Sequence, residues 1–558
     1  MRIRVPPKDS REIHGSGGPA ARPAQEKVLQ LRNAPARAAS AIASGVLLAL
    51  AMPKFSWWPL AWLAPALLLH SVRDLPWRPA AVLGWVAGFS FYLPALYWLA
   101  PTVVSYTRIG WAAACGLVVL LCAVEACYIA TIAAAVAWIG GGAWRRVFVA
   151  PAAWVVVEWL RTFFPAPFPW IPLATSQVAG PLVLVQVADL AGCYGVSWAI
   201  VLVGAALAEA LAVRREAVAG EPVAGAPPGS SSLKRGGGLV ALAAAVIAAV
   251  VGYGHWRLSE LEAAQEDSHG LTAAIVQGNI PQRLKWQMDR QDEILSRYLE
   301  LSRQAAASGA RLIVWPEAAV PFFLEYDKRR SRLVELATTT GAALVVGAPG
   351  YRDTPAGPRQ YNEAWLILPG RGLAGYYDKI QLVPFGEYVP WGPLLAWVDK
   401  AVEAVGDFGR GSAAVVFEVP DDAHDGNVRL GVLICYEAIF PSFVRRFVLG
   451  GARLLVNISN DAWYGRSAAP YQHLAMAALR AVENRVPLVR ATNTGISAFV
   501  DATGRIHERT PLFEEAVRIR TVAPGRAASL YVRFGNWLVW ASLLLLAMAA
   551  AAKLRRRE

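Results

Sequence analysis

The sequence has little cysteine and little histidine, and this scarcity excludes several kinds of site. Its 558 residues include five Cys and seven His. Four of the cysteines lie in strongly apolar segments, so the remaining thiol, Cys435, has no partner for a disulfide within the polar part of the chain. No two histidines have a His-x-x-x-His or His-Glu-x-x-His spacing, and there is no Walker motif. We therefore expect neither a metal site nor a nucleotide cofactor.

Apolar side chains, by contrast, are in excess. The chain is 55% hydrophobic with 22 Trp and a mean hydropathy of +0.36, whereas soluble domains are about 45–50% apolar. Crossing a bilayer takes about 20 apolar residues. The sequence therefore predicts a polytopic α-helical membrane protein with about eight spans, near residues 38–54, 57–72, 79–104, 110–141, 147–162, 181–212, 238–254 and 534–553.

Lys and Arg residues are distributed unevenly between the predicted loops. With eight spans, the basic clusters of both tails and of the loops near 73–78, 145–146 and 214–235 all fall on one side. Because cytoplasmic loops retain Lys and Arg, we expect both termini in the cytoplasm and the polar segment 256–532 on the far side, which in a bacterium is the periplasm. This distribution accounts for much of the net charge of +13 without a nucleic-acid partner. Residues 1–36 also resemble the start of a signal peptide, but loss of the first span would break the charge pattern.

The polar segment consists of short apolar runs that alternate with helix-like stretches. Runs such as 273–277, 312–315 and 430–434 are separated by helical patterns such as 287–307. This alternation is typical of an α/β domain. We accordingly predict a disordered cytoplasmic tail, a membrane domain with seven spans, a periplasmic catalytic domain, and a last span with a basic tail, at residues 1–36, 37–255, 256–532 and 533–558.

Three apolar runs end on residues that can act together in catalysis. These residues are Glu317 (Leu312-Ile-Val-Trp-Pro-Glu), Lys379 (Tyr376-Tyr-Asp-Lys) and Cys435 (Gly431-Val-Leu-Ile-Cys). A carboxylate, an amine and a thiol at strand ends can form one acid/base-assisted nucleophilic site. Because only a thiolate attacks well, Glu317 is expected to take the thiol proton and Lys379 to stabilise the thiolate and a later oxyanion.

The sequence words around these residues resemble those of a known superfamily. Trp315-Pro-Glu-Ala, Asp378-Lys-Ile-Gln-Leu-Val-Pro-Phe-Gly-Glu-Tyr-Val-Pro and Ile434-Cys-Tyr-Glu are similar to the surroundings of the Glu-Lys-Cys triad in the nitrilase superfamily. The membrane spans on both sides narrow the resemblance to the bacterial apolipoprotein N-acyltransferases. The resemblance implies a nitrilase-like, four-layered αββα sandwich for the α/β domain.

The resemblance also implies supporting residues. Glu387, in Pro384-Phe-Gly-Glu, matches a second essential carboxylate that orients Lys379 or assists proton transfer. Tyr436 and Glu437, directly after the nucleophile, match positions regarded as essential, and the backbone N–H of Tyr436 can serve the oxyanion.

Further matches lie around the expected site. Trp286 matches a tryptophan at the mouth of the active site, although a simple packing role for its indole stays open. Asn362 and the segment 457–465 line the site in such folds. The resemblance gives them no chemical role.

The function implied by the resemblance is a ping-pong acyl transfer. Cys435 attacks an ester of a phospholipid to form a thioester, and the N-terminal amine of a diacylglyceryl-cysteine apolipoprotein then takes the acyl group. The expected partners are a phospholipid acyl donor, a diacylated apolipoprotein acceptor and the inner membrane, with no cofactor and a monomeric enzyme. Confining both lipid-anchored substrates to one membrane raises their effective concentration.

Two alternative functions stay open at this point. A membrane-tethered amidase or nitrilase that hydrolyses a C–N bond would use the same triad, but it has no need of eight spans. A transporter or scaffold with an inert extramembrane domain has no need of the triad. A thioester on Cys435 would distinguish the three functions.

Ionisable residues within the predicted spans are costly in hydrocarbon and need partners. Glu125, Glu158, Arg161 and Asp189 are such residues. Glu158 and Arg161 are three residues apart, so we expect them to neutralise each other on one helix face. The aromatic and proline-rich loop 163–170 that follows is expected on the periplasmic side, where it can guide lipid toward Cys435.

Overall fold

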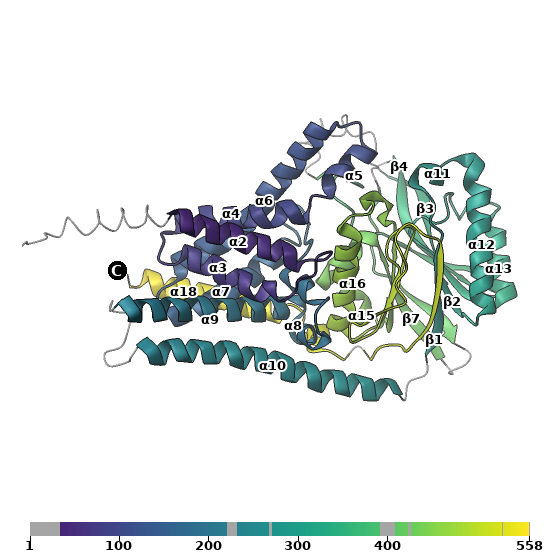
Figure 1. The fold of residues 1–558 in the computed structure, drawn as a ribbon. Coiled ribbons are helices and arrows are strands. Elements are labelled where there is room, and N and C mark those ends of the chain that lie inside the picture. Colours follow the sequence, from purple (N-terminus) through teal and green to yellow (C-terminus); the bar gives the residue numbers. More distant parts are fainter. Residues whose placement is uncertain are drawn as a thin grey trace, which may run out of the picture.

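The chain folds into two parts, a bundle of helices and a domain with two β-sheets (Figure 1). The computed structural model describes residues 34–219, 232–266, 270–355, 357–390, 408–421, 426–526 and 528–556. Residues 1–33 of the predicted tail therefore lie outside the described residues, and the first described helix begins at Ala34.

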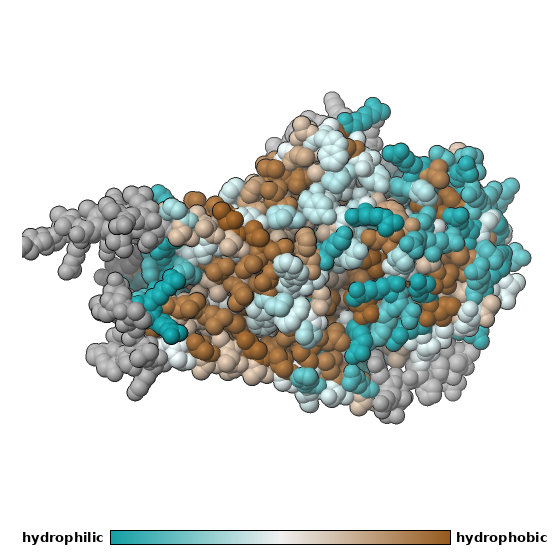
Figure 2. All heavy atoms as spheres, in the orientation of Figure 1, coloured by the Kyte–Doolittle hydropathy of each residue, from teal (hydrophilic) through white to brown (hydrophobic). Residues whose placement is uncertain are grey.

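Helices from both ends of the chain form the bundle. They are α2 (Ala34–Ala51), α3 (Leu60–Val72), α4 (Trp77–Ala95), α5 (Leu99–Tyr106), α6 (Trp111–Ile139), α7 (Ala143–Leu160), α8 (Ala188–Ala191), α9 (Cys193–Ala219), α10 (Ser232–Glu266) and α18 (Trp537–Leu554). The C-terminal helix α18 packs against α7, so the chain returns to the bundle after the sheet domain (Figure 1). The bundle surface seen in Figure 2 is largely apolar, which suits contact with lipid.

Fewer helices than predicted are long and apolar enough to cross a bilayer. In the described ranges these are α2, α6, α9, α10 and α18, and α4 with α5 adds a sixth if this pair, bent by 53°, is one span. The predicted count of about eight spans is therefore not confirmed. Helix α3 has only 13 residues, and α7 carries Arg145, Arg146 and Glu158 within its 18 residues.

The predicted span 181–212 begins later than expected. A short 3₁₀ turn, η2 (Leu182–Leu184), and the four-residue α8 precede α9. Gly192 separates α8 from α9 with a φ of 70°, a conformation that glycine adopts without a steric penalty. Only the part from Cys193 onward is one continuous helix.

The second part is the αββα sandwich that the resemblance implies. One sheet has the strand order β12-β1-β2-β3-β4-β5 and the other the order β11-β10-β9-β8-β7-β6. In each sheet three strands are parallel, β1-β2-β3 and β7-β8-β9, and the outer pairs are antiparallel. The strands are β1 (Leu271–Gln277), β2 (Leu312–Val314), β3 (Ala343–Thr354), β4 (Gly357–Leu368), β5 (Gly372–Asp378), β6 (Val416–Asp421), β7 (Gly426–Ile434), β8 (Leu454–Ser459), β9 (Leu488–Thr492), β10 (Ala498–Val500), β11 (Ile506–His507) and β12 (Ala516–Val522).

Alternating side chains explain the four layers. On β1, Ala274 and Val276 join a core with α12 (Gln291–Ala307) and α13 (Arg330–Thr340), whereas Ala273 and Ile275 join the core that includes the second sheet. Helices α15 (Pro441–Leu449) and α16 (Ala469–Asn484) cover the second sheet on its other side. Figure 1 shows α16 facing the helix bundle, so the second sheet lies closer to the membrane part than the first.

Candidate active site

Cys435 occupies a strained turn at the end of a buried strand. It follows β7 directly and begins a short 3₁₀ helix, η4 (Cys435–Ile439). Its φ of 51° lies in the left-handed region, which costs a non-glycine residue roughly 1–2 kcal/mol. The side chain is 5% exposed. Burial, and then the charge of Glu317, raise the pKa of the thiol, and Lys379 only partly opposes them. The resting thiol is therefore protonated and needs a base.

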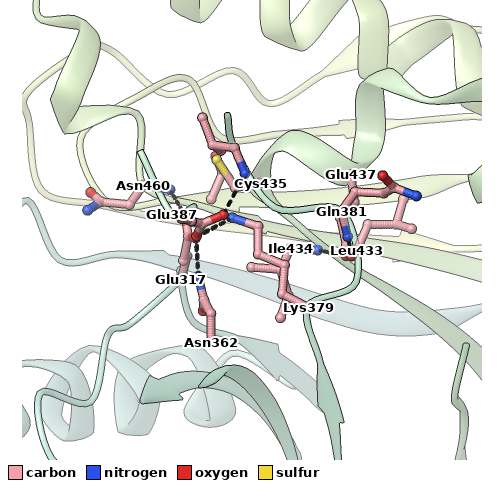
Figure 3. A network of polar contacts seen from close by, with 12 residues as sticks. Glu317, Asn362, Lys379, Gln381, Glu387, Leu433, Ile434, Cys435, Glu437 and Asn460 are labelled. Atoms are coloured by element: carbon pink, nitrogen blue, oxygen red, sulfur yellow. Dashed lines mark hydrogen bonds and ion pairs between the residues drawn. The ribbon is translucent and has the colours of Figure 1, made fainter. Parts of the chain in front are cut away.

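Glu317 is a buried carboxylate held by three donors (Figure 3). One oxygen accepts hydrogen bonds from Lys379 Nζ at 3.2 Å and Asn362 Nδ2 at 2.6 Å, and the other accepts the Asn460 N–H at 2.9 Å. Burial favours the protonated form, but Lys379 and the Asn362 hydrogen bond outweigh it and hold the pKa of Glu317 below its usual value. Glu317 is thus ionised and suited to accept a proton.

Lys379 lies between two carboxylates. Its Nζ is 3.2 Å from Glu317 Oε1 and 2.8 Å from Glu387 Oε1. Burial alone would lower the pKa of Lys379, but the two carboxylates raise it well above its usual value, so the ammonium stays charged. Glu387 is held in turn by the Val383 N–H, which donates to its other oxygen at 2.9 Å. The expected contact between Glu387 and Lys379 is present.

The three residues of the expected triad come from different sheets. Glu317 follows β2 and Lys379 follows β5 in the first sheet, whereas Cys435 follows β7 in the second. Figure 3 shows the Cys435 thiol on the same side as the Lys379 ammonium and the Glu317 carboxylate. The structure therefore brings together the three residues that the sequence analysis singled out.

Glu437 connects the two sheets beside Cys435. One carboxylate oxygen accepts hydrogen bonds from the Tyr377 hydroxyl and from the Ile380 and Gln381 N–H groups at 2.7–3.0 Å. The other oxygen accepts the Ile434 N–H at 2.8 Å. Burial raises the pKa of Glu437 to about 7, although these hydrogen bonds oppose the shift. Its contacts fix the loop after Lys379 to the strand before Cys435, which is the geometry of a positioning residue.

Tyr436 faces the helix bundle. Its buried side chain donates a hydrogen bond from the hydroxyl to the Pro167 carbonyl oxygen at 2.6 Å. Pro167 belongs to the aromatic loop 163–170, which the sequence analysis placed near the site. The residue after Cys435 is thus hydrogen-bonded to that loop.

Arg161 holds the same loop from within the bundle, and its ion-pair partner is Glu125 rather than the expected Glu158. Arg161 pairs with Glu125 at 2.9 Å, and it donates to the Trp170 carbonyl oxygen at 2.9 Å. Glu158 accepts the Leu173 N–H at 2.7 Å instead. Arg161 still has helical backbone angles at the end of α7, but helical spacing does not show that Glu125 on α6 is its partner.

Trp286 and a lysine that the sequence analysis missed lie at the edge of the site. Trp286 caps the short helix α11 (Gln282–Lys285) and is 51% exposed, so its indole is not a core packing residue. Lys285 is 1% exposed, and its Nζ donates to the Glu317 carbonyl oxygen at 3.0 Å. Burial lowers the pKa of Lys285 to about 8. In the sequence, only its position next to Trp286 indicated that Lys285 lies near the site.

Comparisons with known proteins agree with both parts of the structure. The model of the apolipoprotein N-acyltransferase N-terminal domain matches residues 44–206, and the carbon-nitrogen hydrolase model matches residues 272–531. An apolipoprotein N-acyltransferase of Geobacter metallireducens is 39% identical over 93% of this chain and 95% of its own length. The chain belongs to the apolipoprotein N-acyltransferase family. A second apolipoprotein N-acyltransferase, of Allorhizobium ampelinum, is 33% identical over 92% of this chain and 95% of its own length.

The family assignment decides between the functions that the sequence left open. This apolipoprotein N-acyltransferase family member is an enzyme, and its sheet domain matches the carbon-nitrogen hydrolase model that the triad words indicated. Among solved structures, a mutant amidase from Nesterenkonia sp. AN1 is similar over 49% of this chain and 97% of the amidase chain, at 21% identity and a TM-score of 0.37. The assignment rests on the sequence matches.

Proposed function

We propose that the enzyme transfers an acyl chain from a phospholipid to the N-terminal amine of a diacylglyceryl-cysteine apolipoprotein, through a thioester on Cys435. The observation that carries this proposal is the buried Glu317–Lys379 ion pair beside a buried thiol, in a chain whose relatives are named apolipoprotein N-acyltransferases. The apolar helix bundle supports lipid-anchored substrates.

In the first half-reaction, Glu317 takes the Cys435 proton as the sulfur attacks the ester carbonyl carbon. Negative charge moves to the carbonyl oxygen, where the Lys379 ammonium and the Tyr436 N–H can stabilise it. The C–O bond then breaks, and Glu317 returns the proton to the leaving oxygen of the lysophospholipid. The acyl group remains on the sulfur as a thioester.

In the second half-reaction, the lipoprotein amine attacks the thioester carbon and loses a proton to Glu317. The C–S bond breaks, and the sulfur regains its proton from Glu317 as the amide is released. Transfer rather than hydrolysis requires that water be kept from the thioester. The burial of Cys435, Glu317 and Lys379 supports such exclusion.

We further propose that the sheet domain faces the periplasm from the inner membrane and that one chain is sufficient for activity. The one-sided distribution of Lys and Arg supports this orientation. All three proposed catalytic residues belong to one chain, which is compatible with a monomer.

Incubation of the purified protein with phospholipid alone, followed by mass spectrometry, tests the covalent step. We expect one acyl group on Cys435, and the addition of a diacylated lipopeptide should move that group to the peptide amine. Cys435→Ala should abolish both, whereas Cys115→Ala, at an exposed bundle thiol, should change neither. Rapid loss of the acyl group to water without lipopeptide would instead support a tethered hydrolase.

A further inference from the structure

A buried polar cluster lies behind the nucleophile, and the acyl-transfer steps above do not use it. Its members are Asn457 on β8, Asp461, His473 on α16 and Arg490 on β9, and each is at most 1% exposed. Burying so many polar groups is costly unless their hydrogen bonds are satisfied. The contacts of the cluster therefore indicate what it holds.

Two members of the cluster donate to the backbone carbonyl of Cys435. His473 Nε2 lies 3.1 Å from this oxygen, and Asn457 Nδ2 lies 3.4 Å from it. A carbonyl oxygen only accepts hydrogen bonds, so Nε2 must carry the proton. The carbonyl of the nucleophile thus points toward the cluster.

Arg490 fixes both donors. Its guanidinium donates to Asn457 Oδ1, and it lies 3.0 Å from His473 Nδ1 and 2.9 Å from Asp461 Oδ2. His473 Nδ1 also lies 3.1 Å from Asp461 Oδ1, so Arg490 and Asp461 hold the ring from the side opposite to Nε2. Burial and the charge of Arg490 lower the pKa of His473, although Asp461 opposes them, so the imidazole is neutral.

The geometry of the Cys435–Tyr436 peptide bond links the contacts of the carbonyl to the direction of the Tyr436 N–H. The Cys435–Tyr436 peptide is trans, and in a trans peptide the carbonyl and the N–H point in opposite directions. With the carbonyl held by the cluster, the Tyr436 N–H points away from it. If this peptide were rotated, its carbonyl oxygen, rather than the Tyr436 N–H, would point away from the cluster. The left-handed φ of Cys435 is a conformation that persists only when its surroundings hold it.

We propose that His473 is a positioning residue that fixes the orientation of the Cys435–Tyr436 peptide, so that the Tyr436 N–H donates to the oxyanion formed at Cys435. Asn457 assists from the same side, and Arg490 with Asp461 orients the imidazole. The inference rests on the proposed acyl transfer only for the identity of the substrate. Any ester that acylates Cys435 passes through the same oxyanion.

Comparing two reactions of Cys435 tests this role. Acylation by phospholipid, or by p-nitrophenyl acetate, forms a tetrahedral oxyanion. Alkylation by iodoacetamide forms an S–C bond with loss of iodide and develops no oxyanion. Loss of one oxyanion donor costs on the order of 100- to 1,000-fold in rate. For His473→Ala, in which Asn457 still holds the carbonyl, we expect roughly a 10- to 100-fold slower acylation and alkylation within about twofold of wild type.

Matched variants complete the design. His473→Gln keeps a donor near the position of Nε2 and should regain part of the acylation rate. His507→Ala removes a histidine whose partner is Asp501, at 2.8 Å, and should leave both rates unchanged. Asn457→Ser, which removes the weaker donor, should slow acylation less than His473→Ala and also spare alkylation. It supplies the same comparison if His473→Ala does not fold.

Two results would overturn the inference. Equal loss of acylation and alkylation would show that the cluster maintains the fold or the reactivity of the thiol, rather than the orientation of the oxyanion donor. Unchanged acylation in folded His473→Ala and Asn457→Ser would show that the peptide keeps its orientation without these donors. If wild-type protein accepts p-nitrophenyl acetate but never phospholipid, the proposed donor substrate fails, while the role of His473 is still measured with the small ester.

Discussion

The hydroxyl of Tyr436 donates to the carbonyl oxygen of Pro167 at 2.6 Å, and this hydrogen bond joins the residue after Cys435 to the helix bundle. The loop that carries Pro167 is held from the other side by Arg161, which donates to the Trp170 carbonyl. Two residues from separate elements, Tyr436 and Arg161, thus hold this one loop.

Removal of this one hydroxyl should impair the enzyme. Tyr436→Phe leaves the Pro167 carbonyl without its donor, which costs about 1–3 kcal/mol for a buried group, so we expect acylation of Cys435 to slow by roughly 10-fold. Arg161→Lys should act through the same loop, and the double variant should lose less than the product of the single losses. Fully additive effects would show that the two residues act separately. Arg146→Lys, at a residue paired with Glu209 in the bundle, is the control.

Replacing the proposed base should affect acylation and thiol ionisation in opposite ways. Glu317→Gln removes the proton acceptor, so thioester formation should fall by about 100-fold or more. The charge of Glu317 raises the pKa of Cys435 and Lys379 lowers it, so the same variant should lower that pKa. The pH profile of iodoacetamide alkylation should then move to lower pH. A profile that moves to higher pH would contradict the assignment of Glu317 as the charged neighbour of the thiol.

Lys285 should affect the pH dependence of the base. Its positive charge is one of the causes that lower the pKa of Glu317. In Lys285→Met that pKa should rise, and the acidic limb of the acylation rate should move to higher pH, because Glu317 must lose its proton before it can act. Lys328→Met, at an exposed lysine, should leave the limb in place, and an unmoved limb in both variants would exclude this role.

The orientation of the domain can be measured directly. A single cysteine at position 353, in the exposed part of β3, should react with an impermeant maleimide from the periplasm. One at position 214, exposed near the end of α9, should react only after the inner membrane is opened. Both variants need Cys115 and Cys127 replaced, because these native thiols are exposed. Labelling of position 353 from the cytoplasm alone would exclude a periplasmic active site.

The sequence was most informative where chemistry and local pattern coincide. Glu317, Lys379 and Cys435 end apolar runs, and strand ends of one domain can be expected to meet, so the proximity of these three residues was predictable. His473 was not, because its partner is a backbone carbonyl 38 residues away, and a carbonyl leaves no signal in the sequence. The Glu125–Arg161 pair was missed because it joins two helices, α6 and α7, and spacing within one helix does not show a partner on another.

The same limit explains the number of spans. A hydropathy pattern depends on the length and composition of apolar runs, and it correctly predicts the long apolar helices α6, α9 and α10. It does not show where a helix bends, as between α4 and α5 just after Pro94. Nor does it show that the apolar residues 182–191 fold into short turns rather than a continuous helix.

The division of Glu317, Lys379 and Cys435 between two sheets has a consequence for how the enzyme loses activity on heating. Each sheet is held together by its own backbone hydrogen bonds, whereas the distance between Glu317 and Cys435 depends on how the two sheets pack face to face. Slight slippage at that face would separate Glu317 from Cys435 while both sheets keep their strands. Thermal inactivation should therefore precede the loss of β-structure, and reagents that tighten the packing between the sheets should protect activity more than they protect secondary structure.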